Sequence, residues 1–221
     1  RFPVQSNQGN KLLMVAYDVD SNYIDAEPAH DSNQRSLITA YQALWKRITK
    51  NASESEKPLM HIIDNEASQA FKDEIKKNCA LQLAPPDTHR CNLAERAIQT
   101  FKSHFIAILA GVDSSFPMQL WDRLIPQAVL TLNLLRQSHT NPSILAYEHV
   151  NGKFDYNAMP LGPMGCAVQI HDGPQKRLTW AAHTTDGWYL RTSPEHYRCH
   201  VVYVKKTRAE RVSDRVLFQH K

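Results

Sequence analysis

Residues 60–68 read MHIIDNEAS, and residues 88–102 read THRCNLAERAIQTFK. In the first stretch a short apolar run, Leu59–Ile63, ends at Asp64, which is typical of a buried strand whose end reaches solvent. In the second stretch Glu95 opens an amphipathic helix that runs to about Ala110. Two carboxylates at a strand end and a helix start are a common way to hold metal ions in a site that cuts polynucleotides. The pair therefore predicts a metal site.

Each acid also has an ordinary structural interpretation. Asp64 can be a solvated strand end that caps the next helix, and Glu95 lies in a first helical turn, where the helix dipole favours an acid. Gln99 and Lys102 lie four and seven residues after Glu95, so the three share the face opposite the apolar stripe. An acid, an amide and a cation in a row suit metal binding and contact with a phosphate backbone. Spacing alone leaves an ordinary solvated helix face equally open.

Charge is unevenly distributed along the 221 residues. The net charge is +4, but residues 171–221 hold ten Lys/Arg against five Asp/Glu, so the first 170 residues sum to −1. A basic segment behind a neutral body favours a polyanion partner, with a solvated surface as the plain alternative. The four cysteines show no CxxC spacing, which fits a reducing compartment. No apolar run approaches the length of a membrane span.

The order of expected elements indicates an α/β domain followed by a small β unit. We expect a hairpin over 11–27, helices over 31–50 and 67–77, strands over 59–63 and 80–83, and helices over 92–110, 116–137 (kinked at Pro126) and 142–150. These define a domain of residues 1–152 with a mixed sheet flanked by helices. Residues 153–165 form a linker, and 166–221 form a basic β-rich unit. Trp121, Trp180 and Trp188 are expected in the core.

Several stretches together resemble the integrase of copia-type LTR retrotransposons, closest to the divergent elements of diatoms and other stramenopiles. They are IIDNEAS, PPDTHRCNLAERAIQTFKSHFIAILAGV, FPMQLWDRLIPQAVLTLNLLRQ, PLGPMGC and GWYLRTSPEHYRCH, and the match covers nearly the whole chain. The stretch KLLMVAYDVDSNYIDAEP is also similar to the second and third strands of a retroviral-type integrase core.

The resemblance implies a ribonuclease-H-like fold with a D,D,E active site, in which Asp64 is the second acid and Glu95 the third. It implies a two-ion Mg²⁺ or Mn²⁺ site, at which 3′ ends of element DNA are trimmed and joined to target DNA by in-line phosphoryl transfer. It also implies a retrotransposon polyprotein, multimers on DNA, and a place in the nucleus and in cytoplasmic particles. The residues expected to contact DNA are Gln99, Lys102, Arg90, Arg96, Asn92 and His89.

Two departures from that pattern matter. Thirty residues separate Asp64 from Glu95, a few fewer than is usual. In these elements the first acid lies in a D-x-T-G stretch just before the residues that match Arg1–Pro3, so we expect it to be missing from this chain. Asp18 and Asp20 fall in the second strand and its turn, and we do not expect them to replace it. Without its first strand the sheet would lose its central member, and the fragment would be inactive alone.

Two rival functions stay open. One is a nuclease of the same fold that does not join strands. The other is a decayed or repurposed module that binds DNA or integrase subunits without chemistry. A zinc site at His196, Cys199 and His200 is disfavoured, because these residues lie in a strand-like run without a second ligand pair.

Overall fold

The structure, a computed structural model, describes residues 1–53, 57–63, 67–84, 93–173, 180 and 182–219. It divides into two compact units: unit 1 is Arg1–Ser103 with Val129–Phe154, and unit 2 is His104–Ala128 with Asp155–Lys221. No helix in the described part is long and apolar enough to cross a membrane.

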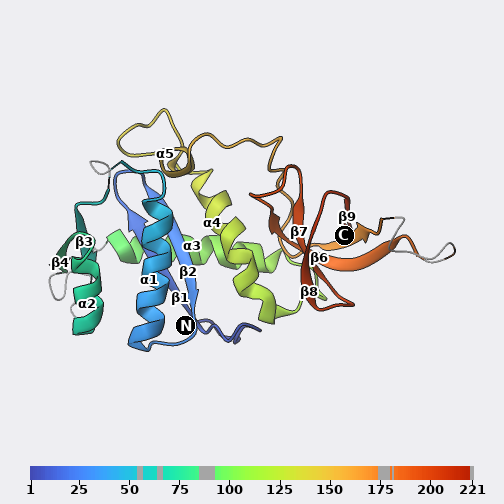
Figure 1. Cartoon of the computed structure of the whole chain (residues 1–221), viewed down its shortest axis with the longest axis horizontal. Helices are drawn as coiled ribbons and strands as arrows, with labels where there is room; N and C mark the ends of the chain where they lie inside the picture. The colour runs from blue at the N-terminus through green and yellow to red at the C-terminus, as the bar shows by residue number, and fades with distance from the viewer. Residues whose placement is uncertain (54–56, 64–66, 85–92, 174–179, 181, 220–221) are drawn as a thin grey trace. The chain divides into compact units, whose positions relative to one another are not determined.

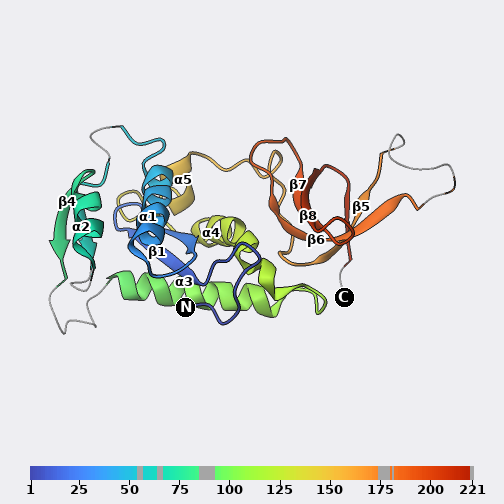
Figure 2. The same ribbon diagram turned by 60° about the horizontal axis from the view of Figure 1, so that its bottom comes forward.

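Unit 1 is built around a hairpin with a helix on each face. Strands β1 (Leu12–Asp18) and β2 (Tyr23–Ala29) pair in antiparallel register, as their apolar runs and the intervening turn predict. Helix α1 (Gln34–Ile48) lies on one face of the hairpin, and α3 (Leu93–Ala110) crosses the other face (Figures 1 and 2). Strand β2 is therefore covered on both sides, and its first four residues are all buried.

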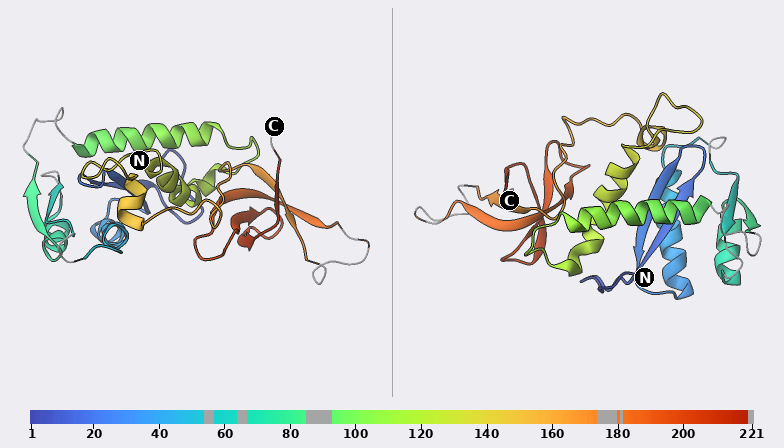
Figure 3. Two further views of the ribbon diagram at one scale, coloured as in Figure 1. Left: turned by 90° about the horizontal axis from the view of Figure 1, so that it is seen from above. Right: turned by 180° about the vertical axis from the view of Figure 1, so that it is seen from behind.

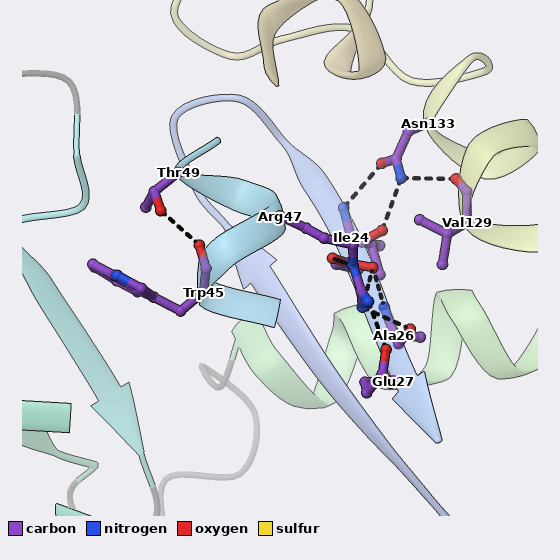
Figure 4. Close-up of polar contacts among 9 residues, drawn as sticks. Ile24, Ala26, Glu27, Trp45, Arg47, Thr49, Val129 and Asn133 are labelled. Carbon is purple, nitrogen blue, oxygen red and sulfur yellow. Dashed lines mark hydrogen bonds and ion pairs between the residues drawn. The ribbon is translucent and has the colours of Figure 1, made fainter. Parts of the chain in front are cut away.

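Two polar side chains complete the hydrogen bonding of β2 (Figure 4). Asn133, the last residue of α4 (Ile125–Asn133), accepts from Ile24 N at 2.9 Å and donates to Ile24 O at 2.8 Å. Arg47 of α1 donates through Nε to Asp25 Oδ2 at 2.8 Å and through Nη1 to Glu27 Oε2 at 2.6 Å. Because the Asp25 side chain is only 2% exposed, this ion pair neutralises a charge that has little contact with water.

The second part of unit 1 is a β–α–β element. Strands β3 (Met60–Ile63) and β4 (Ala80–Leu83) are parallel and are connected through α2 (Gln69–Lys76) (Figure 3). Ser68 caps α2 by accepting a hydrogen bond from Phe71 N at 3.3 Å. Tyr41 of α1 contacts this element, with its ring centroid 5.5 Å from that of His61 and 5.6 Å from that of Phe71.

The single mixed sheet expected for this domain is wrong for the described residues. The β1–β2 pair and the β3–β4 pair form two separate two-stranded sheets. Met60 and Ile62 of β3 are consequently 51% and 53% exposed, although this run has the composition of a buried strand.

Pro126 divides the apolar stretch that follows α3, as its missing N–H predicts. A 3₁₀ helix, η2 (Met118–Leu124), precedes it, and α4 ends at Asn133 rather than near residue 137. Leu135, which lies within the stretch expected to be helical, is therefore 79% exposed. The last helix of unit 1, α5 (Ala146–Asn151), is shorter than expected and has Glu148 accepting from Leu145 N at its start.

Unit 2 contains a five-stranded antiparallel sheet in the order β8-β7-β6-β5-β9 (Figure 3). Its strands are β5 (Ala167–His171), β6 (Thr184–Thr192), β7 (His200–Val204), β8 (Ala209–Ser213) and β9 (Val216–Phe218). Five fully buried residues form the core, namely Val168, Ile170, Tyr189, Val202 and Val204. Gly187 is required in β6, because a Cβ there would lie 2.5 Å from the Tyr203 carbonyl oxygen.

Two tryptophans behave as predicted and one does not. Trp121 is 0% and Trp188 8% exposed, and Phe116 packs edge-on against Trp188 with centroids 6.2 Å apart. Trp180 is 99% exposed, so its placement in the core is wrong. It lies between β5 and β6, where no described element covers it.

His200 links the stability of unit 2 to pH. Its ring lies between Tyr189 and Phe218, with centroids 5.4 and 5.6 Å away, and no polar group in the described structure bonds its buried Nδ1. Burial lowers the pKa of His200 below its ordinary value. The His200 imidazole therefore binds a proton more readily in the unfolded chain than in the folded one. The stability that the buried neutral ring contributes above about pH 6.5 is lost as the pH falls.

We expect His200→Phe, which keeps the aromatic packing, to reduce this loss. Urea unfolding at pH 7.5 and 5.5 measures how the free energy of unfolding depends on pH. This dependence should be weaker in His200→Phe than in the wild-type chain by up to about 1.4 kcal/mol per pH unit, the value for one proton. The exposed His183, changed to glutamine, is the control and should leave the dependence unchanged. Equal pH dependence in His200→Phe and the wild-type chain would contradict this interpretation.

Candidate functional site

The β3–β4 pair brings together the two chain segments that carry the predicted acids. Since the strands are parallel and in register from Met60↔Ala80 to Ile63↔Leu83, their carboxyl ends lie at one edge. The Ala84 N–H donates to Ile63 O at 2.8 Å, so the chain leaving β4 stays beside the end of β3. Asp64 follows Ile63 directly in sequence, and the chain leaving β4 leads to α3.

Glu95 lies in the first turn of α3 and is half-buried. Gln99 and Lys102 are exposed, whereas Ala97 and Phe101 on the opposite side are 4% and 1% exposed. This agrees with the predicted division of α3 into an apolar and a polar side. Ile98, the residue after Ala97, is 46% exposed and lies outside the core. Arg96 is exposed beside Glu95.

Four predicted site residues lie outside the described residues: Asp64, His89, Arg90 and Asn92. Their roles stay predictions. Among the described residues, the structure places Glu95, Arg96, Gln99 and Lys102 on one helix.

The chemistry of the two predicted acids suits a hard divalent cation. Carboxylate oxygens are the ligands that Mg²⁺ and Mn²⁺ prefer. Within the described part of the chain no three His, Cys, Asp or Glu side chains converge as a metal site would require. Asp18, considered above as a substitute acid, instead accepts through Oδ2 from Ser21 N at 3.1 Å and stabilises the hairpin turn.

The three residues considered for zinc do not converge. The His196 ring lies 3.2 Å from Ser193 Oγ through Nδ1, and the Cys199 thiol lies 3.4 Å from Tyr197 O. The His200 ring is enclosed by the aromatic core. His200 begins β7, as the strand-like run predicts, whereas His196 and Cys199 lie in the turn before this strand.

The basic residues of unit 2 divide into paired and exposed groups. Arg211 bonds Asp172 at 2.6 Å, and Lys205 Nζ lies 4.6 Å from the centroid of the Trp188 ring. Lys205, Lys206 and Arg208 are exposed, and the exposed Arg215 lies 3.9 Å through Nε from Asp214 Oδ2. Only part of the positive charge counted in the sequence is therefore available for a polyanion, and DNA binding by this unit stays a prediction.

The sequence interpretation missed a polar group at the hairpin turn of unit 1. There Arg136, which follows α4, donates through Nε to Asn22 O at 2.9 Å. Tyr17 OH donates to Asn22 Oδ1 at 3.0 Å. Arg136 and Asn22 are 114 positions apart in the sequence, so no local pattern predicts this contact.

Comparison with known proteins identifies the type of fold. No protein-family model matches the sequence, and no curated protein matches it. A chain of the simian T-cell lymphotropic virus intasome, in complex with PP2A regulatory subunit B56 gamma, aligns over 95% of this chain and 72% of its own length. The TM-score is 0.51 and the identity 15%. The chain has an integrase-type fold.

A second solved structure is the catalytic core domain of BIV integrase. It aligns over 66% of this chain and 88% of its own length, with a TM-score of 0.46 and 16% identity. Unit 1 combines helices with β-strands, as expected for an α/β domain. At these identities the likeness concerns the fold, and function has to be argued from the residues.

Proposed function

We propose that this chain is the integrase of a copia-type retrotransposon, of the kind found in diatoms and other stramenopiles, released from a polyprotein. It would insert element DNA into host DNA by metal-dependent phosphoryl transfer. One observation carries the proposal: the carboxyl ends of β3 and β4 share an edge, Asp64 follows β3, and Glu95 opens the helix that follows β4. The integrase-type fold and the sequence resemblance support it.

In this proposal Asp64 and Glu95 hold two Mg²⁺ or Mn²⁺ ions. The bound ions supply charge neutralisation at the reacting phosphate and lower the pKa of a bound water or hydroxyl. Gln99 and Lys102 follow Glu95 along the exposed side of α3, where their amide and ammonium groups orient the sugar–phosphate backbone. His89, Arg90, Asn92 and Arg96 add donors near the start of the helix.

The reaction is an in-line displacement at phosphorus. In 3′ trimming a water oxygen forms the new bond to phosphorus, and in joining the trimmed 3′-hydroxyl does so. In both steps the bond to the 3′ oxygen of the cut strand breaks. The protein contributes position and charge, and no covalent protein intermediate is formed.

The organisation proposed for the chain has three parts: a catalytic core over 1–152, a linker over 153–165 and a basic β unit over 166–221. The basic β unit would bind DNA phosphates, and the protein would act as a homo-oligomer on element ends and target DNA. It would be found in the nucleus and in cytoplasmic particles.

A binding module without chemistry is the second candidate. The separation of the β1–β2 and β3–β4 sheets favours it, because a catalytic core of this fold needs a continuous sheet to fix its acids. Such a module would bind DNA or other integrase chains and leave phosphodiester bonds intact.

The deciding experiment is a strand-joining assay on the complete encoded protein, with labelled duplexes that carry the ends of the element. The proposal expects Mg²⁺-dependent 3′ trimming and joined products, both abolished by a chelator. Trimming without joining would favour the nuclease, and DNA binding without either product would favour the binding module.

A further inference from the structure

One face of the unit 2 sheet carries a row of aromatic and acidic side chains across β6, β7 and β8, which lie side by side (Figure 1). The strand register places Trp188 opposite Tyr203, and Tyr203 opposite Glu210. Residues that are directly opposed in an antiparallel pair project from the same face. Tyr203 lies between Val202 and Val204, which belong to the buried core. Since side chains alternate along a strand, the row lies on the face turned away from that core.

Two guanidinium groups converge on the carboxylate of Glu210. Arg191 Nη2 donates to Glu210 Oε2 at 3.0 Å, and Arg123 Nη1 from η2 donates to Glu210 Oε1. Arg191 reaches this face because the pairing of β6 with β7 shifts register between Tyr189 and Arg191, and such a bulge redirects a side chain. Each arginine contacts a different oxygen of one carboxylate, so direct contacts hold the two guanidinium groups beside one another.

The charges of this group balance while Glu210 is in place. Arg123 Nε lies 4.0 Å from Asp122 Oδ1, and the Asp122 side chain is only 2% exposed. Two arginines and two carboxylates have no net formal charge, and without Glu210 one positive charge would remain. A further cation lies at the other end of the row, where Lys205 Nζ is 4.6 Å from the centroid of the Trp188 ring. Glu210 therefore decides how strongly this face attracts an anion.

Glu210 is also the member of the group that an incoming anion can replace. The side chains of Arg123, Arg191 and Glu210 are 28%, 26% and 23% exposed, so the contacts are open to solvent. Ion pairs with this exposure are weak. The arginine fork fits the oxygens of a phosphate as well as those of a carboxylate. A polyanion that contacts the arginines gains in addition from the release of its counterions.

We propose that Arg123 and Arg191 bind one backbone phosphate of duplex DNA in place of Glu210, so that Glu210 competes with DNA and weakens its binding to unit 2. The inference rests on the proposed function, in which the basic β unit binds DNA phosphates. It names the phosphate site and the group that limits its occupancy. When the phosphate enters, the Glu210 side chain turns to solvent and both guanidinium groups contact the DNA backbone.

The test is duplex affinity, measured by fluorescence anisotropy of a labelled duplex with the 221-residue chain between about 50 and 200 mM KCl. Glu210→Gln keeps the shape of the side chain and removes its charge. It should tighten binding by at least about fivefold, the effect of one partly exposed ion pair that no longer has to be broken. Arg191→Gln removes a phosphate contact, so it should weaken binding and lower the magnitude of the slope of log K against log salt by up to about 0.9.

Matched variants separate this role from a merely structural one. Glu195→Gln removes an exposed carboxylate from the same unit and changes the net charge equally, but it should alter the affinity by less than about twofold. Glu210→Gln and Arg191→Gln lose the same ion pair and should nevertheless change the affinity in opposite directions. The double variant Glu210→Gln with Arg191→Gln should lose most of the gain. Urea unfolding of each variant shows whether it folds like the wild-type chain.

Equal affinities of Glu210→Gln and Glu195→Gln, beside normal binding by the wild-type chain, would overturn this inference and leave the proposed function standing. Weaker binding in both Glu210→Gln and Arg191→Gln would also overturn it, because the ion pair would then only hold the sheet. If Glu210→Gln folds poorly, an unchanged salt slope in Arg191→Gln overturns it. A wild-type chain that binds no duplex would overturn the inference together with DNA binding by the basic β unit, whereas the proposed reaction is tested separately by strand joining.

Discussion

Glu95→Gln should lower the rate of Mg²⁺-dependent strand joining by the complete protein by at least about 100-fold, the usual effect of losing one group that stabilises transition-state charge. Glutamine has nearly the same shape as glutamate and is a good helix former, so α3 should keep its start and its buried Ala97 and Phe101. What is lost is the negative charge that would hold a divalent ion. Affinity for duplex DNA should change little.

The joining rate is measured with duplexes that carry element ends, at saturating protein. Glu195→Gln is a suitable control, because it removes an exposed carboxylate from the turn between β6 and β7 and should leave the rate unchanged. Asp64→Asn should cause a loss as large as that of Glu95→Gln. Undiminished joining in either acid variant would remove that residue from the site.

Arg47→Met should destabilise unit 1 by about 2–4 kcal/mol. Removing one partner of a fully buried pair costs about 3–5 kcal/mol, because the other charge is left without compensation. The Asp25 side chain is 2% exposed, but that of Arg47 is 45% exposed, and solvent screening reduces the expected loss. The bond from Arg47 Nη1 to Glu27 is lost in the same variant.

The loss of stability in Arg47→Met should be larger at pH 7 than at pH 5. Burial raises the pKa of Asp25, and Arg47 opposes that rise. A carboxyl whose folded pKa is raised contributes stability below its unfolded pKa and loses it as the pH rises through the folded value. Without Arg47 the pKa should rise further, so the variant should be closer to the wild-type stability at pH 5 than at pH 7.

Urea unfolding at these two pH values measures the effect. Lys46→Met, which removes the neighbouring exposed charge, should stay within about 0.5 kcal/mol of the wild-type chain. Asp25→Asn added to Arg47→Met should restore much of the stability, because the uncompensated charge is then gone. If Arg47→Met were as stable as Lys46→Met, the ion pair would have no role in holding β2.

Most secondary structure could be predicted because local signals agree with the fold. The apolar runs that form β1, β3 and β7 lie between turn residues, and Ser68 marks the start of α2. Strand β8 was missed, since AERVS has a mixed composition and is a strand only through its pairing with β7. The hairpin was expected to end at residue 27, but Pro28 lies within β2, opposite Leu13.

The candidate site could be predicted only where one helix or one strand determines it. The spacing of Glu95, Gln99 and Lys102 fixes their common side on α3 from sequence alone. The pairing of Arg136 with Asn22 depends on tertiary structure, and so does the division into two sheets. Asp64 lies outside the described residues, so its position relative to Glu95 remains a prediction.

The most direct test of the central claim is the metal specificity of a Glu95→Cys variant in the strand-joining assay. A thiolate binds hard Mg²⁺ poorly and binds softer ions well. If Glu95 holds the metal, Glu95→Cys should lose joining with Mg²⁺ and recover part of it with Mn²⁺ or Cd²⁺, whereas Glu95→Ala should recover none. Joining at the wild-type rate with Mg²⁺ in Glu95→Cys would contradict the claim.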